Sequence, residues 1–204
     1  MELCDYCESR KIRIFNDAAY AALNYGTGLC LAEVASIFPN LSWAEAFSAS
    51  KLIGNGTGWR IGAMVGSPDF IGDIKTIKGN TDSGFAAPMA AGALYAIEND
   101  RESISDVKNL YFNRVAILCS ILIKAGMRLA IEPMAGFFTL WQMPKFAFGK
   151  EIADARDFNF TMIENTGLVG VHFGEYIRYA VASADIKVIA SEIEEAFAKA
   201  KVSY

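Results

Sequence analysis

Residues 1–82 alternate short apolar runs with glycine-rich or polar breaks, and this alternation constrains the fold more than any other feature of the sequence. Runs of strand length at residues 12–16, 43–48 and 60–65 predict three β-strands. Polar side chains stand where these runs end or begin, and open α/β sheets place their sites beyond the carboxyl ends of consecutive strands. We therefore predict a mostly parallel α/β layer with a site along one edge.

From residue 83 onward the pattern changes to helices. Residues 85–98 are rich in alanine, a strong helix former. Apolar residues from Val107 to Leu122 recur every three or four positions, which predicts an amphipathic helix of roughly five turns that ends near Gly126. The remaining predicted elements are strands at residues 129–131, 136–141 and 176–181, a short helix at 158–164, and a closing amphipathic helix marked by Ile186, Ile189, Ile193 and Phe197.

These patterns divide the chain into three parts. Residues 1–82 are expected to form part of a larger α/β domain, residues 83–105 a connecting helical region, and residues 106–204 a smaller α+β domain. A length of 204 residues corresponds to one or two domains. The composition, 53% hydrophobic and 21% charged, is typical of a globular protein and argues against disorder.

Charge and hydropathy argue against two classes of partner. The net charge is −4 and the sequence pI is about 5.1, whereas binding nucleic acid through its phosphates needs a basic face. The longest dense apolar stretch, residues 115–123, falls well short of the roughly 20 residues that a membrane span requires. Residues 1–5 are acidic and lack the apolar core of a signal peptide. We therefore expect a soluble, cytoplasmic protein without nucleic-acid or membrane partners.

Cys4 and Cys7 have the C-x-x-C spacing of zinc sites and redox pairs. A structural zinc site needs two further ligands, and the sequence has no second C-x-x-C pair and no nearby histidine. We expect no metal, and we expect these two cysteines, Cys30 and Cys119 to be reduced structural residues in a reducing compartment. A metal- or redox-binding module built on Cys4 and Cys7 is the alternative.

His172 is the only histidine, which excludes mechanisms that need two. Its apolar surroundings favour a structural imidazole with satisfied hydrogen bonds. The glycine-rich segment at residues 54–58 invites a phosphate-loop interpretation, but phosphate loops run from a strand through glycines into a helix N-terminus. Here a predicted strand follows the glycines and no G-K-[ST] is present, so we reject nucleotide binding at this segment.

Five short segments carry chemically distinctive residues. They are Asn16-Asp17-Ala18-Ala19-Tyr20, Ser48-Ala49-Ser50-Lys51, Thr57-Gly58-Trp59-Arg60-Ile61-Gly62, Gly136-Phe137-Phe138-Thr139-Leu140-Trp141 and Phe173-Gly174-Glu175-Tyr176-Ile177-Arg178. In this order they resemble the motifs of the class I and II aminotransferases, fold-type I enzymes that depend on pyridoxal phosphate. The resemblance implies the carboxyl-terminal part of the large cofactor-binding domain, followed by the smaller C-terminal domain.

The resemblance implies a role in binding this cofactor for five residues. Lys51 would form a Schiff base with the cofactor aldehyde and then shuttle a proton. Asp17 would pair with the pyridinium nitrogen, and Tyr20 would hydrogen-bond the phenolic oxygen of the ring. Ser48 and Arg60 would hold part of the phosphate, which suits the charged donor fork of an arginine.

Arg178 would clamp the α-carboxylate of the substrate in the same bidentate way. The resemblance therefore implies transfer of an amino group from an amino acid to a 2-oxo acid by a ping-pong route, in a homodimer. A decarboxylase or a lyase on the same scaffold is a further possibility, although a carboxylate clamp favours transamination.

The sequence also departs from the family pattern. The family's phosphate-binding helix start and its ring-stacking aromatic residue have no counterpart here, which implies a C-terminal fragment that associates with other chains and binds the cofactor weakly. A catalytically inactive fragment is the alternative function. The interval from Lys51 to Arg60 is one residue longer than in the family, and no proline precedes Phe173.

Overall fold

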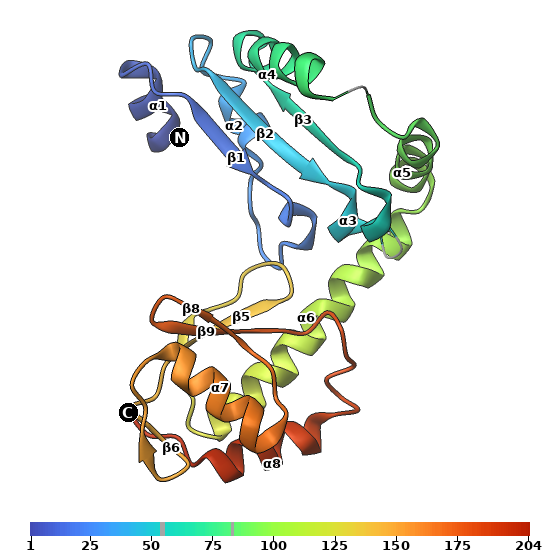
Figure 1. Cartoon of the computed structure of the whole chain (residues 1–204). Helices are drawn as coiled ribbons and strands as arrows, with labels where there is room; N and C mark the ends of the chain where they lie inside the picture. The colour runs from blue at the N-terminus through green and yellow to red at the C-terminus, as the bar shows by residue number, and fades with distance from the viewer. Residues whose placement is uncertain (54–55, 83) are drawn as a thin grey trace. The chain divides into compact units, whose positions relative to one another are not determined.

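The computed structural model describes residues 1–53, 56–82 and 84–204, and it contains two compact units, Met1–Lys108 and Asn109–Tyr204. The helix α6 (Arg101–Lys124) crosses the boundary between the two units (Figure 1). Each unit has its own sheet and its own set of buried apolar side chains.

The sheet of the first unit has the order β1 (Ile14–Asp17), β2 (Trp43–Ser48) and β3 (Gly62–Gly66) (Figure 1). β1 and β2 are parallel, with Asp17 beside Ala46. β3 is antiparallel to β2, with Gly62 beside Ser48. The α/β class is therefore confirmed, and all three strands lie within about two residues of their predicted ranges, but the third strand runs in the opposite direction to the expected parallel layer.

The direction of β3 follows from the segment that precedes it. Parallel strands need a connection that crosses the sheet, usually a long helix. Here the short helices α3 (Ala49–Leu52) and η2 (Gly56–Trp59) pack against each other at the end of β2. The amide of Ala49 also donates to the carbonyl of Ile61, at 3.1 Å. The chain therefore turns back along β2 instead of crossing the sheet.

Helices cover both faces of this sheet. The Ala32 amide of α2 (Leu31–Ala35) donates to the Glu45 carboxylate, at 3.2 Å, which places α2 on the Glu45 face. Phe70 of α4 (Pro68–Thr81) stacks on Phe15, which lies on the opposite face. Beside them, α1 (Glu2–Ser9) contributes Cys4 and Cys7 to a small core with Ala35 and Leu41. The remaining helical elements of the unit are η1 (Ala21–Leu23) and α5 (Ala87–Asn99).

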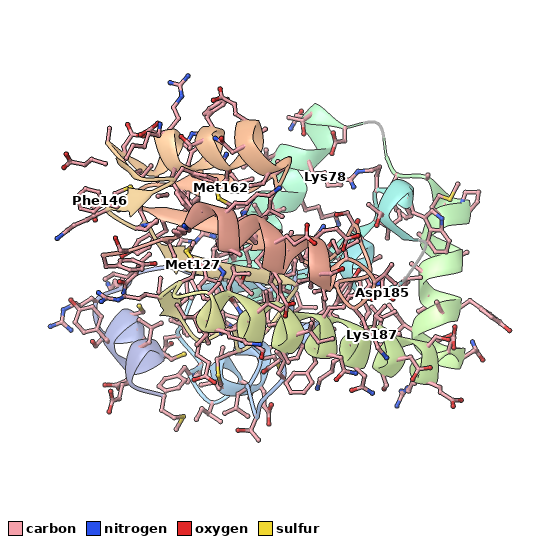
Figure 2. The ribbon with its side chains drawn as sticks, turned by 90° about the horizontal axis from the view of Figure 1, so that it is seen from below. Lys78, Met127, Phe146, Met162, Asp185 and Lys187 are labelled. Atoms are coloured by element: carbon pink, nitrogen blue, oxygen red, sulfur yellow. The ribbon has the colours of Figure 1, made fainter. Side chains whose placement is uncertain are left out.

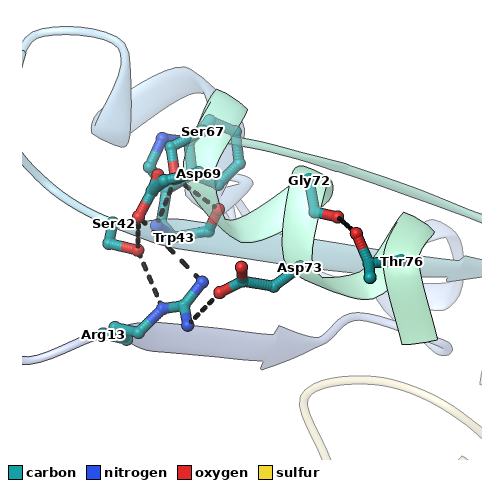
Figure 3. A network of polar contacts seen from close by, with 8 residues as sticks. All are labelled: Arg13, Ser42, Trp43, Ser67, Asp69, Gly72, Asp73 and Thr76. Carbon is teal, nitrogen blue, oxygen red and sulfur yellow. Dashed lines mark hydrogen bonds and ion pairs between the residues drawn. The ribbon is translucent and has the colours of Figure 1, made fainter.

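A polar network fixes the start of α4 to the sheet (Figure 3). Arg13 donates from Nη1 to Asp73, at 2.7 Å, and from Nε to the Ser42 hydroxyl, at 3.0 Å. Ser42 in turn donates to Asp69, in the first turn of the helix. The hydrogen bonds from Ser42 and Ser67 lower the pKa of Asp69 from its ordinary value of 3.8 to about 2.

This pKa shift predicts a loss of stability in acid. Because the pKa of Asp69 is lowered in the folded state, its ionised carboxylate stabilises the fold above about pH 4, and this contribution is lost as the pH falls towards 2. We expect Asp69→Asn to lower the urea midpoint at pH 6 and to have little effect at pH 2. Glu98→Gln, on exposed α5, is the control. An equal effect of Asp69→Asn at both pH values would contradict this assignment.

The sheet of the second unit is antiparallel, in the order β4 (Leu129–Ile131), β5 (Phe138–Gln142), β9 (Tyr176–Ala180) and β8 (Val171–Phe173). The other elements of the unit are the hairpin β6 (Phe146–Ala147) with β7 (Lys150–Glu151), and the helices α7 (Ala155–Thr166) and α8 (Ala190–Ala200). Asp154 caps α7 by accepting from the Asp157 amide, and Gly167 ends it in the left-handed conformation. The predicted strands and helices of residues 106–204 all occur, with shifted ends.

Buried side chains from the sheet and from α6, α7 and α8 form one core. Trp141, Phe158 and Phe197 are its largest fully buried members. Met127 and Met162, labelled in Figure 2, are buried in the same core. No helix in residues 1–53, 56–82 or 84–204 is both long and apolar enough to cross a bilayer.

Candidate active site

Strand direction gathers the candidate cofactor-binding residues of the first unit at one edge of its sheet. Asp17 ends β1 and Ser48 ends β2, and the parallel pairing of these strands brings their carboxyl ends together. Because β3 runs the other way, its beginning lies at the same edge, and Arg60 stands two residues before Gly62. The antiparallel β3 thus brings Arg60 to this edge.

Register also places Asp17 and Ser48 on one face. Asp17 lies directly beside Ala46, so both side chains point to the same face of the pleated sheet. Ser48 is two residues beyond Ala46 and therefore points to that face as well. A carboxylate and a hydroxyl consequently share the side of the sheet opposite to Glu45, with Asp17 exposed and Ser48 half-buried.

Lys51 lies in α3, directly after β2, and its side chain is half-buried. Its Nζ is 5.7 Å from the centre of the Tyr20 ring, at the outer limit of a cation–π contact. Tyr20 precedes η1, which packs against α3. Within the described part of the chain, Lys51 forms no ion pair with a carboxylate.

Arg60 has the left-handed backbone conformation, with φ of 55°, which costs a residue with a side chain roughly 1–2 kcal/mol. Its Nη1 donates to the Thr57 carbonyl, at 3.0 Å, and the Thr57 hydroxyl donates to the Ser50 carbonyl, at 3.2 Å. These two hydrogen bonds connect Arg60 to the residue before Lys51. Strain of this kind is retained where the surrounding structure enforces it, often at functional sites.

Gly62 is required by the close approach of β3 to β2. A Cβ atom at this position would lie 2.7 Å from the Phe47 carbonyl oxygen, closer than van der Waals contact allows. We expect Gly62→Ala to destabilise the first unit by about 1–3 kcal/mol, because the two strands must separate. Chemical denaturation measures this effect. Gly79→Ala in α4, where a Cβ would meet open space, should be neutral or stabilising. Equal effects of the two substitutions would contradict the account.

Arg178 belongs to the second unit, in the middle of β9. Its guanidinium carbon lies 4.4 Å from the centre of the Phe138 ring of β5. Both residues line a cavity of about 430 Å³, together with Phe173 and Glu132. The structure therefore brings Asp17, Ser48, Lys51, Arg60 and Tyr20 into one region of the first unit, and it places Arg178 in a pocket of the second.

The structure also locates the histidine and the cysteines. His172 is exposed in β8, so its imidazole is not enclosed in a core. All four cysteines are free thiols, as expected, and Cys4 and Cys7 are buried, but Cys30 is exposed and has no place in a core. Burial is the main cause that raises the pKa of Cys119 to about 11. Among the described residues, no group of three or more His, Cys, Asp or Glu side chains is arranged to hold a metal ion.

The structure adds two pocket residues that sequence reasoning had not singled out. Phe173 belongs to the last of the five motifs, and its position in that motif was the available signal. Glu132 lies between β4 and Pro133 in a segment that matches none of the motifs, and nothing in the sequence indicated that it would line a cavity.

Comparison with known proteins gives one family. The family model described as aminotransferase class I and II matches residues 1–193. The chain is 30% identical over 176 residues to an LL-diaminopimelate aminotransferase of Natranaerobius thermophilus, covering 84% of this chain and 43% of that protein. A second LL-diaminopimelate aminotransferase, from Methanocaldococcus jannaschii, is 30% identical over 182 residues, covering 88% and 43%. The chain thus spans less than half the length of these relatives.

Solved structures share the fold at lower identity. An alpha-aminoadipate aminotransferase from Thermus thermophilus, complexed with N-(5'-phosphopyridoxyl)-L-leucine, has a TM-score of 0.80 at 18% identity, covering 97% of this chain and 52% of that chain. An aspartate aminotransferase from Thermotoga maritima has a TM-score of 0.77 at 19% identity, covering 95% and 49%. These likenesses support the partial α/β transferase fold described above.

Proposed function

The chain belongs to the class I and II aminotransferase family, and from this premise we propose that it carries the lysine-bearing part of an aminotransferase site that uses pyridoxal phosphate. One observation carries the proposal. The edge of the first sheet presents a carboxylate, a hydroxyl, an amine and a guanidinium, from Asp17, Ser48, Lys51 and Arg60.

This donor set fits the groups that the cofactor would present. A carboxylate suits a protonated ring nitrogen, and an amine without a carboxylate partner suits an aldehyde. A hydroxyl and a guanidinium suit a phosphate. Asp17, Lys51, Ser48 and Arg60 would hold the cofactor through these pairings, and Tyr20 would donate to the phenolic oxygen of its ring.

When bound, pyridoxal phosphate supplies an aldehyde that captures amino groups and a ring that withdraws electrons from the captured carbon. Asp17 would pair with the protonated ring nitrogen and so support this withdrawal. Lys51 would remove the proton from the substrate Cα as a general base. Arg178 would bind the substrate through its α-carboxylate, to which a guanidinium can donate two parallel hydrogen bonds.

The substrates and partners follow from the same proposal. An amino acid donates its amino group, a 2-oxo acid accepts it, and the relatives named above make a diamino acid such as LL-diaminopimelate the first substrate to test. Because the chain spans 43% of those relatives, we propose that residues outside it complete the phosphate site in a homodimeric assembly. The free thiols support a cytoplasmic location, because the cytoplasm keeps cysteines reduced.

Titration of the purified chain with pyridoxal phosphate, followed by visible absorbance, tests the proposal. We expect a saturable yellow band, weaker in affinity than in a complete aminotransferase because part of the phosphate site is absent from this chain. Arg60→Ala should weaken the affinity further by about tenfold, the loss of one charge-assisted hydrogen bond. A band that grows linearly without saturation would contradict cofactor binding and would favour a catalytically inactive fragment.

A further inference from the structure

One cavity of the second unit contains a guanidinium and a carboxylate that do not pair with each other. Arg178 and Glu132 both line the cavity of about 430 Å³. Considering residues 1–53, 56–82 and 84–204, neither side chain takes part in an ion pair. Opposite charges that share a cavity without pairing can both be satisfied by a ligand that carries an anion and a cation at separate positions.

The guanidinium of Arg178 is held by its surroundings, whereas Glu132 is exposed and only its backbone is restricted. The Arg178 guanidinium lies over the Phe138 ring, and its strand is flanked by β5 and β8. Glu132 directly follows β4 and precedes Pro133, which restricts its backbone to extended conformations. Its negative charge also contributes, after burial, to the raised pKa of the Cys119 thiol in α6. Because Glu132 is exposed, a ligand in the cavity can reach its carboxylate.

The rest of the cavity wall is mainly apolar. Its apolar lining residues are Ile131, Pro133, Met134, Ala135, Phe138, Leu140 and Phe173. Such a wall favours an aliphatic chain over a polar one, because each buried methylene contributes about 0.8 kcal/mol. The cavity thus offers an anion site, an apolar surface and a cation site.

We propose that this cavity selects amino acids whose aliphatic side chain ends in a cationic group, and that Glu132 is the residue that determines this specificity. The proposal rests on the proposed function, in which Arg178 takes the α-carboxylate. The aliphatic part of the side chain lies on the apolar wall, and the distal ammonium pairs with Glu132. A side chain whose only terminal charge is a carboxylate meets like charge at Glu132, and a neutral side chain leaves Glu132 without a partner.

Ligand binding to the 204-residue chain without any cofactor tests the proposal. The side-chain Nε–H resonance of Arg178 and the amide of Leu140 are followed by NMR during titration. The three probes are L-lysine, L-norleucine and L-glutamate; lysine and norleucine have the same unbranched carbon chain apart from the terminal ammonium. We expect lysine to bind about fivefold more tightly than norleucine, the gain from a partly exposed ion pair, and glutamate to bind most weakly.

Variants assign the preference to one residue. Glu132→Gln, which keeps the shape of the side chain, should remove the difference between lysine and norleucine and improve glutamate binding. Glu151→Gln, on β7 and outside the cavity, should leave the order of the three ligands unchanged. Arg178→Ala should weaken all three ligands.

The possible results separate the two proposals. A lysine affinity no greater than that of norleucine, an unchanged ratio in Glu132→Gln, or absence of binding by all three ligands would overturn the specificity proposal. These titrations do not involve Lys51. Failure of cofactor capture at Lys51 together with a Glu132-dependent lysine preference would overturn only the proposed function.

Discussion

Lys51→Ala should remove covalently retained cofactor from the protein altogether. Lys51 lies in α3, directly after the end of β2 at Ser48, and its Nζ is 5.7 Å from the centre of the Tyr20 ring. After incubation with pyridoxal phosphate and reduction with borohydride, wild-type chain should carry phosphopyridoxyl label by mass spectrometry, and the variant should carry none. In a complete enzyme the same substitution should lower turnover by at least ~10²–10⁴-fold, the usual contribution of a general base.

Two control variants test whether retention of the label needs the amine of Lys51 itself, and not only a positive charge or any lysine of the unit. Lys75→Ala removes an exposed lysine of α4 in the same unit and should leave the label unchanged. Lys51→Arg keeps a positive charge, but a guanidinium cannot replace the amine as a nucleophile, so this variant should also lack the label. Equal labelling of wild type and Lys51→Ala would show that the aldehyde reacts with surface lysines alone.

Trp141→Ala should destabilise the second unit by about 3–5 kcal/mol. Trp141 is fully buried in β5, between Leu129 of β4 and Ile177 of β9, and its removal leaves a large cavity in the core. Its indole Nε1 also donates to the Thr139 hydroxyl, at 2.8 Å, so the substitution removes a buried hydrogen bond. An effect of this size is a large fraction of the stability of a typical domain.

Urea unfolding measures this effect, with tryptophan-independent detection by far-UV circular dichroism. Phe160→Ala is the matched control, because Phe160 is an aromatic residue of the same unit that is 47% exposed. Phe160→Ala should lower the free energy of unfolding by less than ~1 kcal/mol, as substitutions outside the core usually do. Similar costs for the two variants would contradict the position of Trp141 in the core.

The sequence predicted the fold best where a local pattern determines the structure. The apolar run at residues 43–48 became β2, and the three-or-four spacing from Val107 to Leu122 became part of α6. The helix α4 was missed, since it buries no residue among those described and its two glycines weaken the helical pattern. The direction of β3 was also missed, because it depends on how α3 and η2 pack and not on the strand's own residues.

The candidate site was predictable to a similar extent. Motifs identified Asp17, Lys51 and Arg60, because each of them lies in a short segment with characteristic neighbouring residues. Their assigned roles and the three-part domain division stay predictions. Glu132 could not be found in this way, because a charged residue before a proline is ordinary in a sequence. Only the pairing of β4 with β5 and of β5 with β9 brings it to the Arg178 pocket.

The most direct test of the central claim is peptide mapping of the wild-type chain after borohydride reduction in the presence of stoichiometric pyridoxal phosphate. The phosphopyridoxyl label should be found on the peptide that contains Lys51, at up to one equivalent per chain, and other lysines should be unlabelled. Label distributed over exposed lysines such as Lys75 and Lys124, with none concentrated at Lys51, would contradict it.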